Sequence, residues 1–230
     1  MADYDLLIFD WDGTLVDSVA KIVESIRVAA DVCGLAQLDE APIKGIIGLG
    51  LPEAIAVLYP DLRDVLLIER FRMAYAEHYL ALEAAPSALF PGVAEGLDAF
   101  RQAGYRMAVA TGKTRRGLQR VLEGRGWADY FEATRCADET ASKPDPLMLR
   151  EILTQCGVSP RRALMIGDSC FDLQMARNAG VDAVGVGYGA QSLESLQAFE
   201  PCLAIMEFAE LHDWLLPVGA RRLTEVHVYG

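Results

Sequence analysis

Short apolar segments that end in a polar or glycine-rich turn recur four times along this chain. Each is only long enough for a strand, and a nearly continuous apolar run is typical of strands buried on both faces of a parallel sheet. The four segments are residues 4–10, 105–111, 163–168 and 181–186.

Helical patterns lie between these segments. Residues 93–103 are followed by Gly104 and residues 146–156 by Gly157, and glycine suits the left-handed conformation that often closes a helix. Alternating strands and helices favour an α/β fold with a doubly wound, Rossmann-like parallel sheet.

One long interval, residues 17–85, breaks this alternation because it contains helical periodicity and no strand-like segment. It begins directly after the first strand, so we expect an inserted all-helical cap over the carboxyl ends of the strands, where open α/β sheets bind ligands. The predicted domains are therefore an α/β core of residues 1–16 and 86–230 and a helical cap of residues 17–85.

The net charge of the chain limits its expected binding partners, and its cysteines bear on the cellular compartment. The 230 residues carry a formal net charge of −12 at pH 7, so neither nucleic acid nor an anionic membrane surface is an expected partner. A small anionic substrate is still compatible with the negative net charge of the protein, because a metal ion and a few nearby Lys or Arg side chains can neutralise the charge of the substrate. The scattered cysteines and the lack of a signal segment or long apolar stretch favour a cytoplasmic protein.

Two carboxylates, Asp10 and Asp12, follow the first strand-like segment in the run DWDGT. The Asp-Gly pair taken alone is equally well explained as a turn. At the carboxyl edge of a parallel sheet, however, acids at i and i+2 can point into one crevice. One of them can then attack as a nucleophile while the other moves protons.

Two further acids, Asp168 and Asp172, follow the third strand-like segment in the run GDSCFD. Helix capping would explain Asp168 taken alone. Four carboxylates on neighbouring strand ends would repel one another unless a hard cation lay among them, and oxygen ligands with positions left for water and phosphate suit Mg²⁺. The pattern therefore indicates a magnesium site.

Hydrogen-bond donors and positive charge for a phosphoryl group occur at two other turns. Thr111 and Gly112 follow the second strand-like segment, where a hydroxyl and backbone N–H groups can hold phosphate oxygens. Lys143 precedes a proline-marked helix start. Taken singly, Thr111 is better explained as a capping residue and Lys143 as a solvated charge, so only their placement relative to the acids indicates a phosphate site.

In the order of four motifs, DWDGTLVDS, Thr111, Lys143-Pro144 and GDSxxD, the chain closely resembles the haloacid dehalogenase-like hydrolases. The resemblance covers nearly the whole chain, and the helical insertion is similar to that superfamily's cap of the phosphoglycolate phosphatase and β-phosphoglucomutase type. It implies a Mg²⁺-dependent phosphatase that hydrolyses a small phosphorylated metabolite through a phosphoaspartyl intermediate, with phosphoglycolate as the leading named substrate.

The resemblance also implies roles for individual residues. Asp10 would be the nucleophile and Asp12 the general acid and base, whereas Thr111, Gly112 and Lys143 would bind the phosphoryl group. Position 112 is glycine where many relatives carry asparagine or another polar residue, which implies more contact of the phosphate with the backbone.

The implied metal ligands are Asp10, the backbone carbonyl of Asp12, and Asp168. Asp172 would be either a further ligand or a partner of the ligands. Two alternative functions stay open at this point. A phosphosugar mutase would use the same Asp10 and Asp12 but return the phosphoryl group to a sugar, and a non-catalytic binding or regulatory protein could share the fold.

Overall fold

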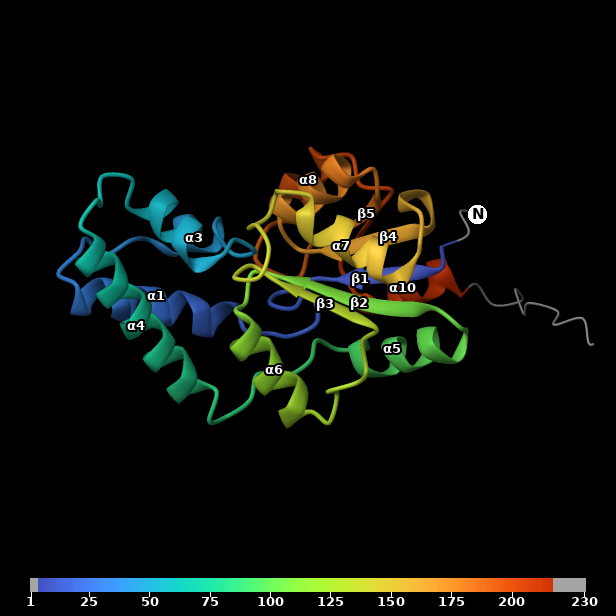
Figure 1. Ribbon diagram of the computed structural model, residues 1–230, viewed down its shortest axis with the longest axis horizontal. Coiled ribbons are helices and arrows are strands. Elements are labelled where there is room, and N and C mark those ends of the chain that lie inside the picture. Colours follow the sequence, from blue (N-terminus) through green and yellow to red (C-terminus); the bar gives the residue numbers. More distant parts are fainter. Residues whose placement is uncertain (1–3, 217–230) are drawn as a thin grey trace, which may run out of the picture.

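The computed structural model describes residues 4–216, so the end of the expected core, residues 217–230, lies outside the described residues. Its six strands form one sheet, in which every pair of neighbours is parallel, in the order β3-β2-β1-β4-β5-β6. The doubly wound α/β fold is therefore confirmed (Figure 1). The strands are β1 (Leu6–Phe9), β2 (Arg106–Thr111), β3 (Ala133–Cys136), β4 (Ala163–Gly167), β5 (Asp182–Val186) and β6 (Leu203–Ile205).

The four strand-like segments of the sequence form the four inner strands, whereas the prediction misses the two edge strands. β3 has the sequence ATRC, in which Thr134 and Arg135 are half-buried, and β6 has only three residues. An edge strand has one unpaired side and is often short. It therefore lacks the continuous apolar run that marks the inner strands.

Strand β1 explains why the inner strands carry that run. All four of its residues are buried, and they alternate between two separate apolar clusters: Leu7 and Phe9 face one cluster, and Leu6 and Ile8 the other. Successive side chains of a strand point to opposite faces. A sheet covered by helices on both faces thus requires apolar residues at every position.

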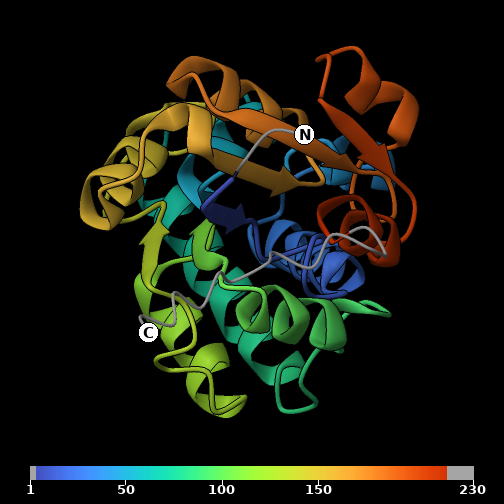
Figure 2. The same cartoon turned by 90° about the vertical axis from the view of Figure 1, so that its right-hand side faces the viewer.

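Helices cover both faces of the sheet (Figure 1 and Figure 2). The cluster on one face includes side chains of α5, α6 and α10, and the cluster on the other includes those of α7 and α8. The core helices are α5 (Val93–Gln102), α6 (Arg115–Gly124), α7 (Leu147–Cys156), α8 (Cys170–Ala179), α9 (Leu193–Gln197) and α10 (Phe208–Leu215), with a short 3₁₀ helix at Pro160–Arg162.

The insertion between β1 and β2 contains four helices, and all of residues 17–85 are described. It has its own apolar cluster, which includes Ile26 of the first helix and Phe71 of the fourth. Its two connections to the core lie side by side, because Val16 and Leu89 form an isolated antiparallel bridge. The helices are α1 (Val19–Val32), α2 (Glu40–Lys44), α3 (Leu51–Leu58) and α4 (Val65–Leu82).

This helical insertion stands beyond the carboxyl ends of the strands (Figure 1), and residues 17–85 are called the cap below. Among the described residues, no helix combines the length and the apolar character needed to cross a membrane.

Candidate active site

The predicted site residues come together where the strands end beneath the cap. Asp10 directly follows β1, Thr111 ends β2, and Asp168 directly follows β4. Because β1 lies between β2 and β4 in the sheet, three adjacent strands deliver these side chains to one edge. Parallel strands place their carboxyl ends on the same side, which is why residues far apart in the sequence meet here.

Three buried carboxylates form the centre of this site. One oxygen each from Asp10, Asp168 and Asp172 lies within 4.8 Å of the others. The ammonium group of Lys143, which is also fully buried, lies 2.8 Å from Asp10 Oδ1 and 2.7 Å from Asp172 Oδ1. One lysine thus faces three acids, and the cluster is short of positive charge.

Burial and mutual repulsion make ionisation of these acids costly. Burial raises the pKa of Asp10 well above its ordinary value, and the charges of Asp172 and Asp168 add to the rise, although Lys143 opposes it. Burial and the charge of Asp172 raise the pKa of Asp168 to about 7. Additional positive charge among the carboxylates would relieve this cost.

The donor set fits a hard divalent cation. Asp10 Oδ2 is buried and has no hydrogen-bond partner among the described residues, although buried polar atoms nearly always have one. Carboxylate oxygens are the ligands that Mg²⁺ takes. Asp172 differs from the other two acids, because its Oδ2 accepts hydrogen bonds from the hydroxyl and the backbone N–H of Ser169 in the capping box that begins α8.

Two loops hold Asp168 in place. Its Oδ1 accepts a hydrogen bond from Thr14 Oγ1 at 3.0 Å, and its Oδ2 accepts one from the Ala190 N–H at 2.7 Å. A Cβ atom on Gly13 or on Gly189 would overlap Asp168 Oδ2. Glycine at these two positions therefore lets both loops approach the acid. The loop after β5 was missed in the sequence analysis, although its run GYGA carries the glycine signal.

Asp12 lies outside the carboxylate cluster and has different partners. Its Oδ1 lies 3.0 Å from Lys113 Nζ and accepts a hydrogen bond from Ser18 Oγ at 2.6 Å. Burial lowers the pKa of Lys113, but the charge of Asp12 together with the contributions of Tyr79 and Tyr75 more than offsets this effect. The pKa of Lys113 is therefore raised, and the lysine stays charged. Neither Lys113 nor Ser18 was singled out from the sequence, although Ser18 ends the run DWDGTLVDS and Lys113 directly follows Gly112.

The turn after β2 lies against the cap. Thr111 is fully buried, and its Oγ1 accepts a hydrogen bond from the Lys113 N–H at 3.2 Å. A Cβ atom on Gly112 would lie 2.5 Å from the carbonyl oxygen of Leu49 and 2.8 Å from that of Gly48. The absence of a side chain at position 112 therefore makes room for the cap loop of residues 48–50.

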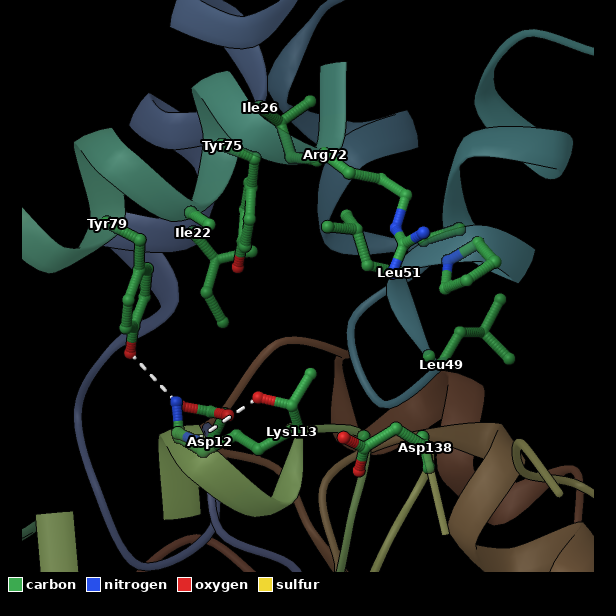
Figure 3. Close-up of a pocket in the computed structure, with 18 of the residues that line it drawn as sticks. Asp12, Ile22, Ile26, Leu49, Leu51, Arg72, Tyr75, Tyr79, Lys113 and Asp138 are labelled. Atoms are coloured by element: carbon green, nitrogen blue, oxygen red, sulfur yellow. Dashed lines mark hydrogen bonds and ion pairs between the residues drawn. The ribbon is translucent and has the colours of Figure 1, made fainter. Parts of the chain in front are cut away.

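Besides the hydrogen bond from Ser18 to Asp12, two others connect the cap directly to the site loops of the core. The Gly50 N–H donates to Ser142 Oγ at 2.8 Å, next to Lys143. Lys113 Nζ donates to the hydroxyl of Tyr79, on α4, at 3.0 Å (Figure 3). The cap is thus docked on the core, and a cavity of about 660 Å³ lies between them, with Asp10 and Asp12 among its lining residues.

All seven residues that the sequence analysis proposed for reaction or binding lie in this region, and none is displaced from it. The chemical roles assigned to them stay predictions. The residues are Asp10, Asp12, Thr111, Gly112, Lys143, Asp168 and Asp172.

Comparison with known proteins gives consistent matches over most of the chain. A family model described as haloacid dehalogenase-like hydrolase matches residues 7–186. A phosphoglycolate phosphatase of Agrobacterium fabrum is 36% identical over 214 residues, which are 90% of each chain. A Dickeya dadantii protein named "Probable phosphatase IndB" is 35% identical over 211 residues, 90% of this chain and 91% of its own.

A crystal structure of a predicted phosphoglycolate phosphatase from Haemophilus somnus has the same arrangement of elements. It superposes with a TM-score of 0.81 at 26% identity and covers 94% of this chain and 99% of its own. The similarity therefore includes both the core and the cap.

Proposed function

Because this chain belongs to the haloacid dehalogenase-like hydrolases and is a hydrolase of phosphate monoesters, we propose that it works with Mg²⁺ and through a covalent phosphoryl group on Asp10. The observation that carries this proposal is the environment of the Asp10 carboxylate. Its carboxylate is buried at a strand end, one oxygen is held by Lys143, and the other has no partner among the described residues. A carboxylate in this setting is fixed in position and still has an oxygen available for reaction or for metal binding.

The contacts of Asp10 support its role as the nucleophile. Its Oδ1 accepts a hydrogen bond from the Trp11 N–H at 2.7 Å and pairs with Lys143 at 2.8 Å. The Trp11 ring is itself buried in the core cluster against Trp127 and Phe131, so the backbone beside Asp10 is held by packing. A nucleophile positioned in this way needs little reorganisation before it attacks.

In the proposed first step, an Asp10 oxygen attacks phosphorus and the bond to the leaving alcohol breaks. Asp12 enters this step in its protonated form and gives its proton to the alcohol oxygen as that oxygen leaves. In the second step, a water molecule attacks the same phosphorus, Asp12 takes its proton, and the Asp10 carboxylate is restored as inorganic phosphate departs. Lys113 and Ser18 both contact Asp12 Oδ1, so they hold the carboxyl group in place while Oδ2 gives and takes the proton.

In this proposal, the other site residues stabilise the negative charge of the phosphoryl group. Lys143 supplies a buried positive charge beside Asp10, and Thr111 with the N–H groups of its turn would hold phosphate oxygens. Mg²⁺ would be held by Asp10, Asp168 and the backbone carbonyl of Asp12, and when bound it would offset the charge of the transferring phosphoryl group.

The substrate class that the relatives support is a small phosphorylated metabolite, and phosphoglycolate is the reference ester because relatives carry that name. The test is release of inorganic phosphate from a panel of esters with Mg²⁺ and with a chelator. We expect metal-dependent release that is lost in Asp10→Asn. The control Asp129→Asn changes an exposed acid of the core and should leave release unchanged. Turnover retained in Asp10→Asn would contradict the mechanism.

A further inference from the structure

The cavity between cap and core is larger than the phosphoryl chemistry requires. Its volume of about 660 Å³ lies within the range of about 300–1,000 Å³ in which proteins bind drug-sized ligands. Asp10 and Asp12 lie at its core end, and most of the other lining residues belong to the cap. An alcohol bonded to a phosphoryl group at Asp10 would therefore extend into the space beneath the cap.

The walls of this space are mainly apolar. The apolar side chains that surround it are Ile22 and Ile26 of α1, Leu49 of the cap loop, Leu51 at the start of α3, and Tyr75 of α4 (Figure 3). Ile26 is 1% exposed and Ile22 8% exposed, and both belong to the apolar cluster of the cap. Their positions are held by packing, so the wall is preformed and offers a surface against which apolar groups can be buried.

Four cations from the described part of the chain line this space, and Lys113 is the one among them that is not exposed. Lys113 is paired with Asp12 at the core end. The arginines that line the cavity are all exposed to solvent. A carboxylate brought beneath the cap would therefore lose its hydration without gaining a buried cation among the described residues, which is unfavourable. The three arginines are Arg72, Arg116 and Arg120.

From these walls and charges, we infer that the enzyme prefers phosphate monoesters whose leaving alcohol has an apolar body, aliphatic or aromatic, over small hydrophilic esters such as phosphoglycolate. The inference rests on the proposed function and narrows its substrate class. The docked cap makes the preference stronger, because the contacts of Gly50 with Ser142 and of Tyr79 with Lys113 hold the apolar wall over the site.

The test compares the monoesters of primary alcohols of increasing size: ethyl, butyl, hexyl and phenethyl phosphate, with phosphoglycolate as the small anionic ester. The unsubstituted alkyl esters have leaving groups of similar acidity, so differences among them report binding. Each methylene buried in the cavity should raise kcat/KM about three- to fivefold. The gain should appear mainly as a lower KM, because the alkyl group is buried both before and during reaction.

Two substitutions on α4 test whether the preference for longer alkyl esters arises from binding in the cavity. Ala76 lines the cavity and is exposed, whereas Ala81 is exposed and is not among the lining residues. Ala76→Trp should fill part of the cavity and lower the ratio of kcat/KM for hexyl over ethyl phosphate by tenfold or more. Ala81→Trp places the same side chain on the same helix and should leave that ratio unchanged.

The affinity of Asp10→Asn for the same esters, measured by calorimetry, gives a readout without turnover, and it should rise along the alkyl series. A flat alkyl series, or a preference for phosphoglycolate, would overturn the inference. Metal-dependent release lost in Asp10→Asn would in that case leave the proposed function standing. No release from any ester would overturn both.

Discussion

The ammonium group of Lys113 in the core lies 3.0 Å from the hydroxyl of Tyr79 in the cap and 3.0 Å from Asp12 Oδ1. One side chain therefore contacts both Asp12, the proposed general acid and base, and the cap that covers it. Lys113 also lies 4.6 Å from the centre of the Tyr79 ring, which adds a cation–π contribution. Docking of the cap and positioning of Asp12 are thereby coupled.

Tyr79→Phe should weaken catalysis by removing the hydroxyl that bonds Lys113 while keeping the ring. A hydrogen bond to a charged group contributes about 1.5–3 kcal/mol. Since both side chains are partly exposed, we expect the lower end, a loss of about tenfold in kcat/KM. Tyr59→Phe is the control, because the Tyr59 hydroxyl donates to Ala36 within the cap. Equal losses in the two variants would contradict the coupling.

The same coupling can be measured in a double-mutant cycle. Lys113→Met keeps the length of the side chain and removes its charge, so Asp12 loses its ion pair and Tyr79 its partner. If Tyr79 acts through Lys113, adding Tyr79→Phe to Lys113→Met should cause little further loss. Additive losses would show that the two residues act independently.

How far the sequence predicts this site depends on where each residue stands relative to the sheet. Asp10, Thr111 and Asp168 are predictable because they follow or end apolar runs, and adjacent parallel strands end at one edge. Tyr79 and Lys113 are separated by 34 positions, and their contact exists only because the cap docks on the core. No local pattern encodes such a contact.

The environment of Gly112 also depends on the docking of the cap, and the sequence does not predict it. The sequence shows a small residue in place of a polar one, but only the structure shows that the carbonyl groups of Leu49 and Gly48 occupy the space. The edge strands β3 and β6 were missed for a related reason. Their placement depends on pairing with β2 and β5 rather than on an apolar run of their own.

Gly112→Ala should impair cap docking and leave the core folded. The added Cβ atom would lie 2.5 Å from the Leu49 carbonyl oxygen, so the cap loop must move away from the site. We expect kcat/KM to fall at least tenfold while the urea midpoint changes little. Gly124→Ala is the control, since a Cβ atom there meets nothing within 4 Å and alanine stabilises a helix by up to about 1 kcal/mol. Full activity in Gly112→Ala would refute the proposed docking contact.

Lys143→Met should destabilise the protein strongly. It would leave the fully buried Asp10 and Asp172 without the cation that lies between them, and breaking a buried ion pair in this way costs about 3–5 kcal/mol. Urea unfolding in a chelator measures the loss. The matched control is Lys44→Met, which removes an exposed pair with Glu40 and should change the free energy of unfolding little, because solvent screens such a pair. Similar costs for both variants would mean that Lys143 is not the main counter-charge of the cluster.

Metal binding should be visible in thermal unfolding without any substrate. A ligand that binds only the folded state adds about 2.7 kcal/mol at 100 times its Kd, so Mg²⁺ should raise the Tm of the wild-type protein. Asp168→Asn removes one carboxylate of the cluster, which lessens repulsion in the metal-free protein and weakens metal binding. We therefore expect a Tm in chelator at or above that of the wild type and a much smaller rise with Mg²⁺. Asp129→Asn should keep the full rise, and an undiminished rise in Asp168→Asn would place the metal elsewhere.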